Sequence, residues 1–386
     1  MSRPHAVRIL SLTASVLTLV ALTTSCDPAP APAAAGDVAG DVAAGEGVPF
    51  LVDPTWPREM PNDWIMGAVT GVFVDSRDHV WVTHLVETLT PEETAAVQDP
   101  PIGTCCVPAP TVVEFDPEGN VVQGWGDPSQ DISVYPRNPH GVFVDHNDFV
   151  WVGTYRHHRV MKFTRAGELV MTIGEYDVSG GSNDTVTLGG PSGIWVDPED
   201  NEVFVSDGYG NRRVVVFDGE TGAYLRHWGA YGETPDDEYD FGERSPDGPP
   251  PRQFSTVHGL TGSRDGRIYV ADRRGNRIQA FDQQGAFLAE KIIAPRTLAS
   301  GSAFVVVLSP DPEQRWLYLA DGTNHKVWIL RRSDLEVVGE FGRGGRQVGQ
   351  FLRPHGMSID SQGNLYVGEA STGRRVQKFS LQPGHP

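Results

Sequence analysis

A unit that recurs six times along the chain constrains its fold more than any other feature. A clear copy is PHGVFVDHNDFVWVGTYRHHRVMKFTRAGELVMTIG, from Pro139 to Gly174, and comparable copies begin at Val69, Pro191, Val257, Ala303 and Pro354. Each copy alternates apolar and polar residues over short runs that break at turn pairs such as Ala166-Gly167, without a sustained helical period. Four short strands in a repeat of about forty residues are typical of a β-propeller blade. The sequence therefore predicts an all-β, six-bladed propeller.

Ring closure and two insertions are the departures from this regular pattern. The sixth copy has three strands before the sequence ends, so we expect Phe50-Leu51-Val52 to supply its fourth strand and close the ring. Insertions interrupt the pattern at 86–110 and 230–253. Long loops in compact repeat folds often carry function. The second insertion is acidic and Pro-rich, and we interpret it as a solvated excursion.

The composition excludes several classes of protein. Of the 386 residues, 39% are hydrophobic, which suffices for a substantial core. The 44 glycines and 30 prolines follow no Gly-X-Y period, which excludes collagen. The formal net charge is −19 and no run of Lys or Arg occurs. A nucleic-acid-binding protein needs a basic footprint, so we exclude that class.

The N-terminal segment indicates export. Two arginines open the chain, and an apolar run too short to span a bilayer leads to Leu-Thr-Thr-Ser-Cys26. This order resembles a bacterial lipoprotein signal, so we expect a signal peptide at 1–25 and a lipidated Cys26. The alternative is an ordinary secretory signal followed by an unmodified cysteine. A disordered Pro/Ala/Gly tether at 26–47 would then hold the propeller, 48–386, to the outer side of a bacterial membrane through the lipid alone.

The other two cysteines, Cys105 and Cys106, are adjacent in the first insertion. Adjacent cysteines can form a strained vicinal disulfide. They can also bind metal, act as a metal or redox sensor at the channel mouth, or pack as two small residues in a loop. These interpretations remain open at the level of the sequence.

Three histidines occupy one repeat position. They are His140, His258 and His355, each directly before the glycine of the first strand in copies two, four and six. Copies one and three carry Thr70 and Ser192 there, and the alignment of copy five is unclear. First strands line the channel of a propeller, and alternate blades of six lie about 120° apart. Three imidazoles with an open fourth position are the ligand set of a catalytic zinc site, although copper, iron and nickel also suit imidazole. The alternatives are channel histidines bonded to water or a carboxylate, or duplication without function.

Two further side chains are expected on the same face. The loops that follow each second strand lie beside the start of the first strand, and these loops carry Tyr209 in copy three and Arg273 in copy four. A tyrosine near a metal can act as a base, and an arginine can hold a carboxylate through two hydrogen bonds. The alternatives are a packed aromatic residue in a turn and a surface Asp-Arg pair.

The blade pattern resembles NHL-repeat propellers, and the constellation resembles the peptidyl-α-hydroxyglycine α-amidating lyase family. The segments NPHGVFVD, VFVSDGYGNRR, VHGL, VADRRGNRIQAF and RPHGMSIDSQGNLYVGEA carry this likeness, between Asn138 and Phe379. The resemblance implies a zinc ion held by the three histidines, Tyr209 as the catalytic tyrosine and Arg273 as an active-site arginine. It implies cleavage of a C-terminal α-hydroxyglycine peptide into a peptide amide and glyoxylate, without redox chemistry.

The sequence departs from this family at several positions. Leu85 follows His84 where the family has an active-site arginine, and Arg353 or another channel arginine is the candidate replacement. Gly356 stands where the family has an aspartate that binds a structural calcium ion, which argues against Ca²⁺ here. The two blade disulfides of the family are missing as whole pairs, at Gly189 with Gly210 and at Tyr269 with Ala280.

Two other functions compete with the lyase. One is a non-catalytic extracytoplasmic binding propeller, which predicts no metal requirement and contacts through the insertions. The other is another metal-dependent propeller enzyme, such as a lactonase, and propeller lactonases generally hold calcium with carboxylate and amide ligands rather than with histidine. We expect a monomer with a small-molecule or peptide substrate in the central channel. Fold alone does not choose among these functions.

Overall fold

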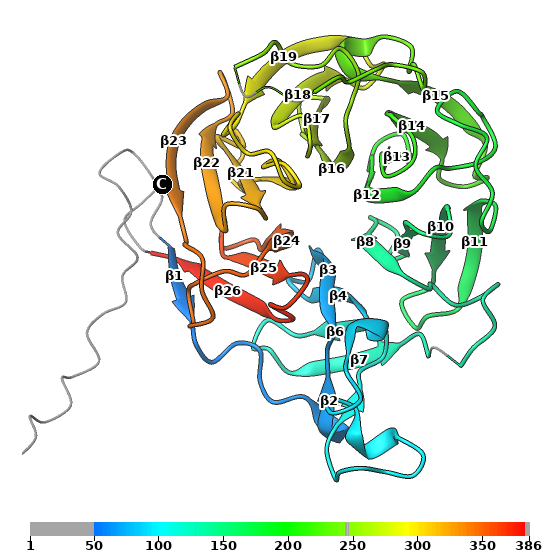
Figure 1. The fold of residues 1–386 in the computed structure, drawn as a ribbon, viewed down its shortest axis with the longest axis vertical. Coiled ribbons are helices and arrows are strands. Elements are labelled where there is room, and N and C mark those ends of the chain that lie inside the picture. The colour runs from blue at the N-terminus through cyan, green and yellow to red at the C-terminus, as the bar shows by residue number, and fades with distance from the viewer. Residues whose placement is uncertain (1–49, 128, 244, 246, 383–386) are drawn as a thin grey trace, which may run out of the picture. The chain divides into compact units, whose positions relative to one another are not determined.

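The computed structural model describes residues 50–127, 129–243, 245 and 247–382. Six four-stranded antiparallel sheets stand around a common axis, which confirms the predicted six-bladed propeller (Figure 1). The expected signal peptide, Cys26 and the tether up to residue 47 lie outside the described residues. In the part that is described, no helix has the length and apolarity to cross a membrane.

The blades follow one another in chain order. Blade one contains β3 (Ala68–Val74), β4 (Val80–Leu85), β6 (Val112–Phe115) and β7 (Val121–Trp125). Blade two contains β8 (Pro139–Val144), β9 (Val150–Thr154), β10 (Arg159–Phe163) and β11 (Leu169–Gly174). Blade three contains β12 (Pro191–Val196), β13 (Glu202–Asp207), β14 (Arg213–Asp218) and β15 (Tyr224–Trp228).

The second half of the ring has the same organisation. Blade four contains β16 (Val257–Gly262), β17 (Arg267–Asp272), β18 (Arg277–Asp282) and β19 (Phe287–Ile292). Blade five contains β20 (Val305–Leu308), β21 (Trp316–Asp321), β22 (Lys326–Arg331) and β23 (Glu336–Phe341). Blade six contains β24 (Pro354–Ile359), β25 (Leu365–Glu369) and β26 (Val376–Leu381).

The fourth strand of blade six is β1 (Phe50–Asp53), which pairs antiparallel with β26. Figure 1 shows this blue strand beside the red end of the chain. The prediction that residues 50–52 close the ring is therefore confirmed. The first strand of every blade lies innermost, and each of these six strands contacts the first strand of both neighbouring blades.

Turn chemistry within each blade explains why the strands begin and end where they do. Between β8 and β9, the Asp145 carboxylate accepts the backbone N–H groups of Asn147 and Phe149 and the indole N–H of Trp151. Asp75 binds Trp81 in the same way in blade one. An aspartate that accepts hydrogen bonds from the backbone two and four residues later stabilises a tight turn.

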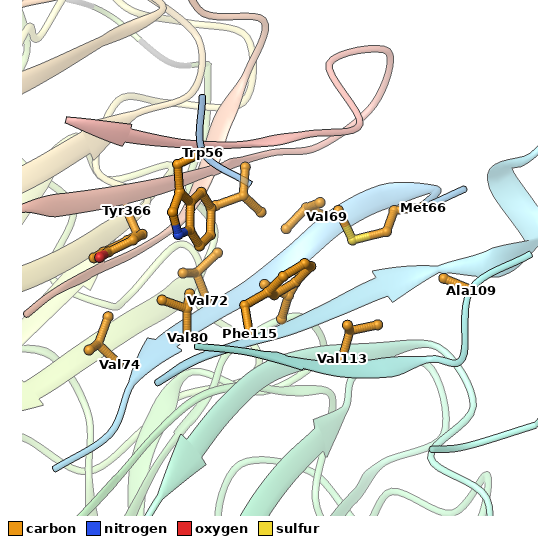
Figure 2. Close-up of a cluster of buried hydrophobic side chains, with 12 residues drawn as sticks. Trp56, Met66, Val69, Val72, Val74, Val80, Ala109, Val113, Phe115 and Tyr366 are labelled. Atoms are coloured by element: carbon orange, nitrogen blue, oxygen red, sulfur yellow. The ribbon is translucent and has the colours of Figure 1, made fainter. Parts of the chain in front are cut away.

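The hydrophobic core is divided among the six interfaces between neighbouring blades, with one cluster of buried side chains at each. Figure 2 shows the cluster between blades six and one, where Trp56 lies against Tyr366 and Phe115. Their ring centroids are 4.9 Å and 5.6 Å from that of Trp56. Packing of this kind fixes the distance of each inner strand from the axis.

The two insertions leave the ring at its rim. The first contains the 3₁₀ turns η2 (Val86–Thr88) and η3 (Ala95–Val97) and the strand β5 (Val107–Pro108), which pairs with β2 (Trp64–Ile65) after η1 (Pro61–Asp63). It also contains a disulfide between Cys105, which is exposed, and Cys106, which is half-buried. The second insertion begins at η4 (Ala230–Gly232). Its end is anchored by the buried Arg277 of blade four, which donates hydrogen bonds to the carbonyls of Pro251 and Gln253.

Candidate metal centre

Three histidines meet on the axis of the ring. His140, His258 and His355 are the second residues of β8, β16 and β24, and all three are buried. Every pair of their ring centroids is 4.7 Å apart. The ring nitrogens lie within 4.8 Å of one another, so the cluster can bind a metal ion. Within the described part of the chain, this is the one group of His, Cys, Asp or Glu side chains positioned in this way.

The neighbouring blades orient these imidazoles. The Nδ1 atom of His258 lies 2.8 Å from the carbonyl oxygen of Phe304, and that of His355 lies 2.9 Å from the carbonyl oxygen of Thr70. His140 is hydrogen-bonded to the backbone of Ser192. A carbonyl can only accept, so each imidazole donates to it and keeps the lone pair of its other nitrogen.

These three carbonyls come from equivalent positions in the odd-numbered blades. Thr70 and Ser192 are the residues that align with the histidines in copies one and three. Phe304, directly before β20, is their counterpart in blade five. The structure thus settles the alignment of the fifth copy, which the irregular sequence of that copy had left open.

The histidines are neutral at physiological pH. Burial lowers the pKa of His355 to about 3, and burial also holds the pKa values of His140 and His258 well below the ordinary value. The positive charge of Arg273 acts in the same direction on all three. Three buried lone pairs therefore converge with no carboxylate among them. This donor set fits a borderline metal such as zinc.

Glycines allow the inner strands to approach closely enough for this contact. Each histidine is followed by a glycine, namely Gly141, Gly259 or Gly356, and Gly71 and Gly193 take the same place in blades one and three. A Cβ on Gly141 would collide with the carbonyl oxygen of Ser192. A Cβ on Gly356 would lie 2.9 Å from the backbone nitrogen of Val72. An aspartate at position 356 would therefore force strands β24 and β3 apart.

Tyr209 lies at the histidine cluster. Its hydroxyl is 3.0 Å from Nε2 of His140 and 3.2 Å from Nε2 of His258. Arg273 donates a hydrogen bond of 3.1 Å from Nη1 to the same hydroxyl. Burial of the hydroxyl raises the pKa of Tyr209, and the charge of Arg273 opposes that rise. The structure thus brings together all five residues that the sequence analysis selected for the metal and the chemistry.

Buried ion pairs hold the loops that carry these two side chains. Arg213 pairs with Asp207 at 2.9 Å below the Tyr209 loop, and all of these charged atoms are buried. Arg277 pairs with Asp272 at 3.0 Å below the Arg273 loop. These two Asp–Arg pairs therefore have a structural role, since each one joins the two ends of a rim loop and orients it.

Two residues of the site were not selected from the sequence, and a third was named only as a replacement. The Tyr155 ring lies 4.8 Å from the Tyr209 ring and 5.5 Å from the His140 ring. The Phe304 ring lies 5.3 Å from the His258 ring and 5.8 Å from the His355 ring, and the guanidinium of Arg353 lies 5.3 Å from the Phe304 ring. Tyr155 lies in the loop after the second strand of blade two, so the argument that located Tyr209 would have located it too. No comparable signal marks Phe304, because its copy is irregular.

His84, by contrast, lies apart from the cluster. Its Nδ1 accepts the backbone N–H of Gly67 at 3.1 Å, and its Nε2 donates to the carbonyl oxygen of Pro110 at 2.9 Å. Both nitrogens are thus used within blade one and the base of its insertion. Its neighbour Leu85 is half-buried and supplies no charge to the site.

Fold and site together define a six-bladed β-propeller of NHL-repeat type with a buried three-histidine centre. No family model matches the sequence. The chain is 26% identical over 352 residues to peptidyl-alpha-hydroxyglycine alpha-amidating lyase 1 of Drosophila melanogaster, covering 86% of this chain and 59% of that protein. It is 28% identical over 252 residues to peptidyl-glycine alpha-amidating monooxygenase B of Xenopus laevis, covering 63% of this chain and 26% of that protein.

A third homologue is NHL repeat-containing protein 3 of Mus musculus, 24% identical over 349 residues, with 86% of this chain and 84% of that protein covered. Among solved structures, a streptogramin B lyase has a TM-score of 0.51 at 12% identity over 86% of this chain and 98% of its own. A gluconolactonase from Xanthomonas campestris has a TM-score of 0.50 at 14% identity, with 83% of this chain and 88% of that chain covered. These structural likenesses concern the fold alone.

Proposed function

We propose that this protein is a zinc-dependent lyase that splits the C–N bond of an N-acyl α-hydroxyglycine into an amide and glyoxylate. The observation that carries this proposal is the position of the Tyr209 hydroxyl, which contacts two of the three converging imidazoles and Arg273 at once. The distant homologues named as amidating lyases support the same reaction class.

His140, His258 and His355 would hold the metal through the nitrogens that face the axis. When bound, zinc would polarise the hydroxyl oxygen of the substrate and lower its pKa. The buried, neutral imidazoles are kept in the ligating tautomer by the backbone carbonyls behind them. No proton has to leave the histidines before a metal enters.

Tyr209 would act as the general base. The residue is 37% exposed, while its hydroxyl lies against the buried imidazoles of His140 and His258. The charge of Arg273, 3.1 Å away, stabilises the phenolate. The phenolate takes the proton of the substrate's hydroxyl group. The electron pair of the O–H bond then forms the C=O bond of glyoxylate, and the electron pair of the C–N bond moves to nitrogen. That nitrogen takes up the proton from Tyr209 to complete the amide, so atoms and electrons balance without an oxidant.

The test combines metal content with turnover. We expect about one zinc per chain, measured by plasma mass spectrometry. The ion should be lost in the triple variant His140→Ala/His258→Ala/His355→Ala. Tyr209→Phe should keep the metal but lower glyoxylate release from benzoyl-α-hydroxyglycine by about 10²- to 10⁴-fold, the usual contribution of a positioned base.

His146→Ala is the matched control, because it removes an exposed imidazole of blade two. It should change neither metal content nor turnover. Full activity of Tyr209→Phe would remove the proposed base. No stoichiometric transition metal in the unmodified protein would instead leave a binding propeller as the leading function.

A further inference from the structure

Two arginines share one aromatic ring beside the histidine cluster. Arg273 follows β17 and Arg353 precedes β24, and their guanidinium carbons lie 5.2 Å and 5.3 Å from the centroid of Phe304. Arg273 also contacts the ring of Tyr209, at 5.1 Å. The Phe304 ring in turn lies 5.3 Å from the His258 ring and 5.8 Å from the His355 ring. They therefore form one cationic surface at the mouth of the site.

Neither arginine has an acidic partner among the residues that the structure describes. Arg353 donates one hydrogen bond, from Nη2 to the Ser300 hydroxyl at 3.1 Å. The Nε atom of Arg273 is buried without a hydrogen-bond partner. Two fully buried arginines nearby, Arg213 at the start of β14 and Arg277 at the start of β18, each pair with an aspartate instead.

Unpaired, adjacent like charges cost free energy, and this chain has 50 acidic residues against 31 basic ones. The chain thus has enough acidic residues to pair with every arginine, and yet Arg273 and Arg353 have no carboxylate beside them in the part of the chain that the structure describes. Arg353 also has a left-handed backbone, with φ of 61°, and its N–H is bonded to Nδ1 of His325 at 3.0 Å. Backbone strain that is held in place next to a site is typical of a functional constraint.

We infer that Arg273 and Arg353 form a two-armed site for a carboxylate, and that Arg353 is the specificity-determining arm. A planar carboxylate matches the fork of a guanidinium, and two forks over one ring can bind both of its oxygens. The acid end of the substrate then lies on the side of blades four to six. The neutral acyl end lies on the side of Tyr155.

This assignment rests on the proposed function, because the carboxylate is that of the proposed substrate. It can be tested without turnover, by measuring the binding of an unreactive carboxylate. The probes are hippurate, an unreactive N-acyl glycine with a carboxylate, and hippuramide, its neutral analogue. Isothermal titration calorimetry compares the unmodified protein with Arg353→Met, Arg353→Lys and the control Arg343→Met. Arg343 is exposed, so its replacement removes the same charge elsewhere.

We expect Arg353→Met to raise the Kd for hippurate by about 10- to 100-fold, because a charge-assisted hydrogen bond is lost. Arg353→Lys should recover part of the affinity, since it keeps the charge without the fork. Arg343→Met should have no effect on hippurate, and hippuramide should bind all four proteins equally. Absent hippurate binding, or equal Kd values for the unmodified protein and Arg353→Met, would overturn the inference.

Failure of this inference is distinguishable from failure of the lyase proposal. If Arg353→Met loses hippurate while the unmodified protein releases no glyoxylate, the carboxylate site stands and the reaction is wrong. If glyoxylate is released and both proteins bind hippurate equally, the reaction stands and Arg353 is not the second arm.

Discussion

At the scale of single residues, histidine has two roles in this protein, ligand candidate and structural hydrogen-bonding group. The tautomer of the imidazole distinguishes them. His258 and His355 donate from Nδ1 to a carbonyl, so their Nε2 atoms keep the lone pair that can bind a metal. His84 accepts at Nδ1 and donates from Nε2, so no lone pair remains for a metal. All of these side chains are buried, which means that burial alone does not separate a ligand from a structural histidine.

His84 should contribute to the pH dependence of stability. Burial lowers the pKa of His84 to about 4 in the folded protein, whereas an unfolded histidine titrates near 6.5. Below pH 6.5 the unfolded state therefore binds the extra proton, and stability is lost as the pH falls from 6.5 towards 4. The slope from this one group is at most about 1.4 kcal/mol per pH unit.

Thermal unfolding between pH 7 and 4.5 tests this expectation. In His84→Asn the amide can still accept the Gly67 N–H but does not titrate. The variant should be less stable at pH 7, because it loses the hydrogen bond to Pro110, and its stability should fall less steeply with pH. Parallel curves for the two proteins would show that His84 is not responsible.

At the scale of the strand, glycine spacing rather than side-chain reach determines the size of the centre. The inner strands approach through residues without a Cβ, such as Gly141 against the carbonyl of Ser192. The backbone of Gly141 does not adopt a positive φ, so close contact is the reason for glycine at this position. Any side chain at position 141 would move β8 away from β12, and it would move His140 away from His258 and His355.

Gly141→Ala should therefore weaken metal binding as well as the fold. We expect a loss of about 1–3 kcal/mol in stability, typical of overpacking, and a lower zinc affinity in competition with a chromogenic chelator. Gly248→Ala in the second insertion is the control, since this glycine is exposed and the atom nearest to its Cβ would be the side-chain Cβ of the exposed Ser245, at 3.3 Å. If the Gly141 variant lost stability but kept its zinc affinity, strand spacing would not govern the centre.

The same scale explains what could be predicted from the sequence. The strands and their order can be predicted from the alternation of apolar and polar residues and from the turn residues. The recurrence of histidine at one repeat position in three copies is enough to locate the cluster. The rim depends instead on loop conformations. Arg353 reaches the site through a left-handed backbone, and Phe304 lies in the least regular copy. A residue pattern with period two contains no information about either feature.

At the scale of the whole molecule, the ring is closed by strands from both ends of the chain. β1 pairs with β26 in the register Phe50 to Leu381. The Phe50 ring packs between blades five and six, 5.6 Å from Tyr318 and 5.1 Å from Phe341. Closure thus adds core contacts as well as backbone hydrogen bonds.

Phe50→Ala should destabilise the protein by about 3–5 kcal/mol, the usual cost of emptying a buried aromatic position. Leu51 is 42% exposed on the same strand, so Leu51→Ala should change stability by less than about 0.5 kcal/mol. Denaturant unfolding followed by tryptophan fluorescence measures both. Equal midpoints for the two variants would mean that the closing strand contributes little.

The alternation of histidine and carbonyl around the axis has an arithmetical consequence. Each imidazole donates its proton to the backbone of the next blade in the ring, and the accepting blades carry no ligand, so ligand and acceptor blades alternate. An alternating sequence closes on itself only when the number of blades is even. Four blades would provide two ligands, and eight would provide four and fill a tetrahedral ion completely. Six is the smallest alternating ring that offers three imidazoles and would leave one position of a tetrahedral ion open.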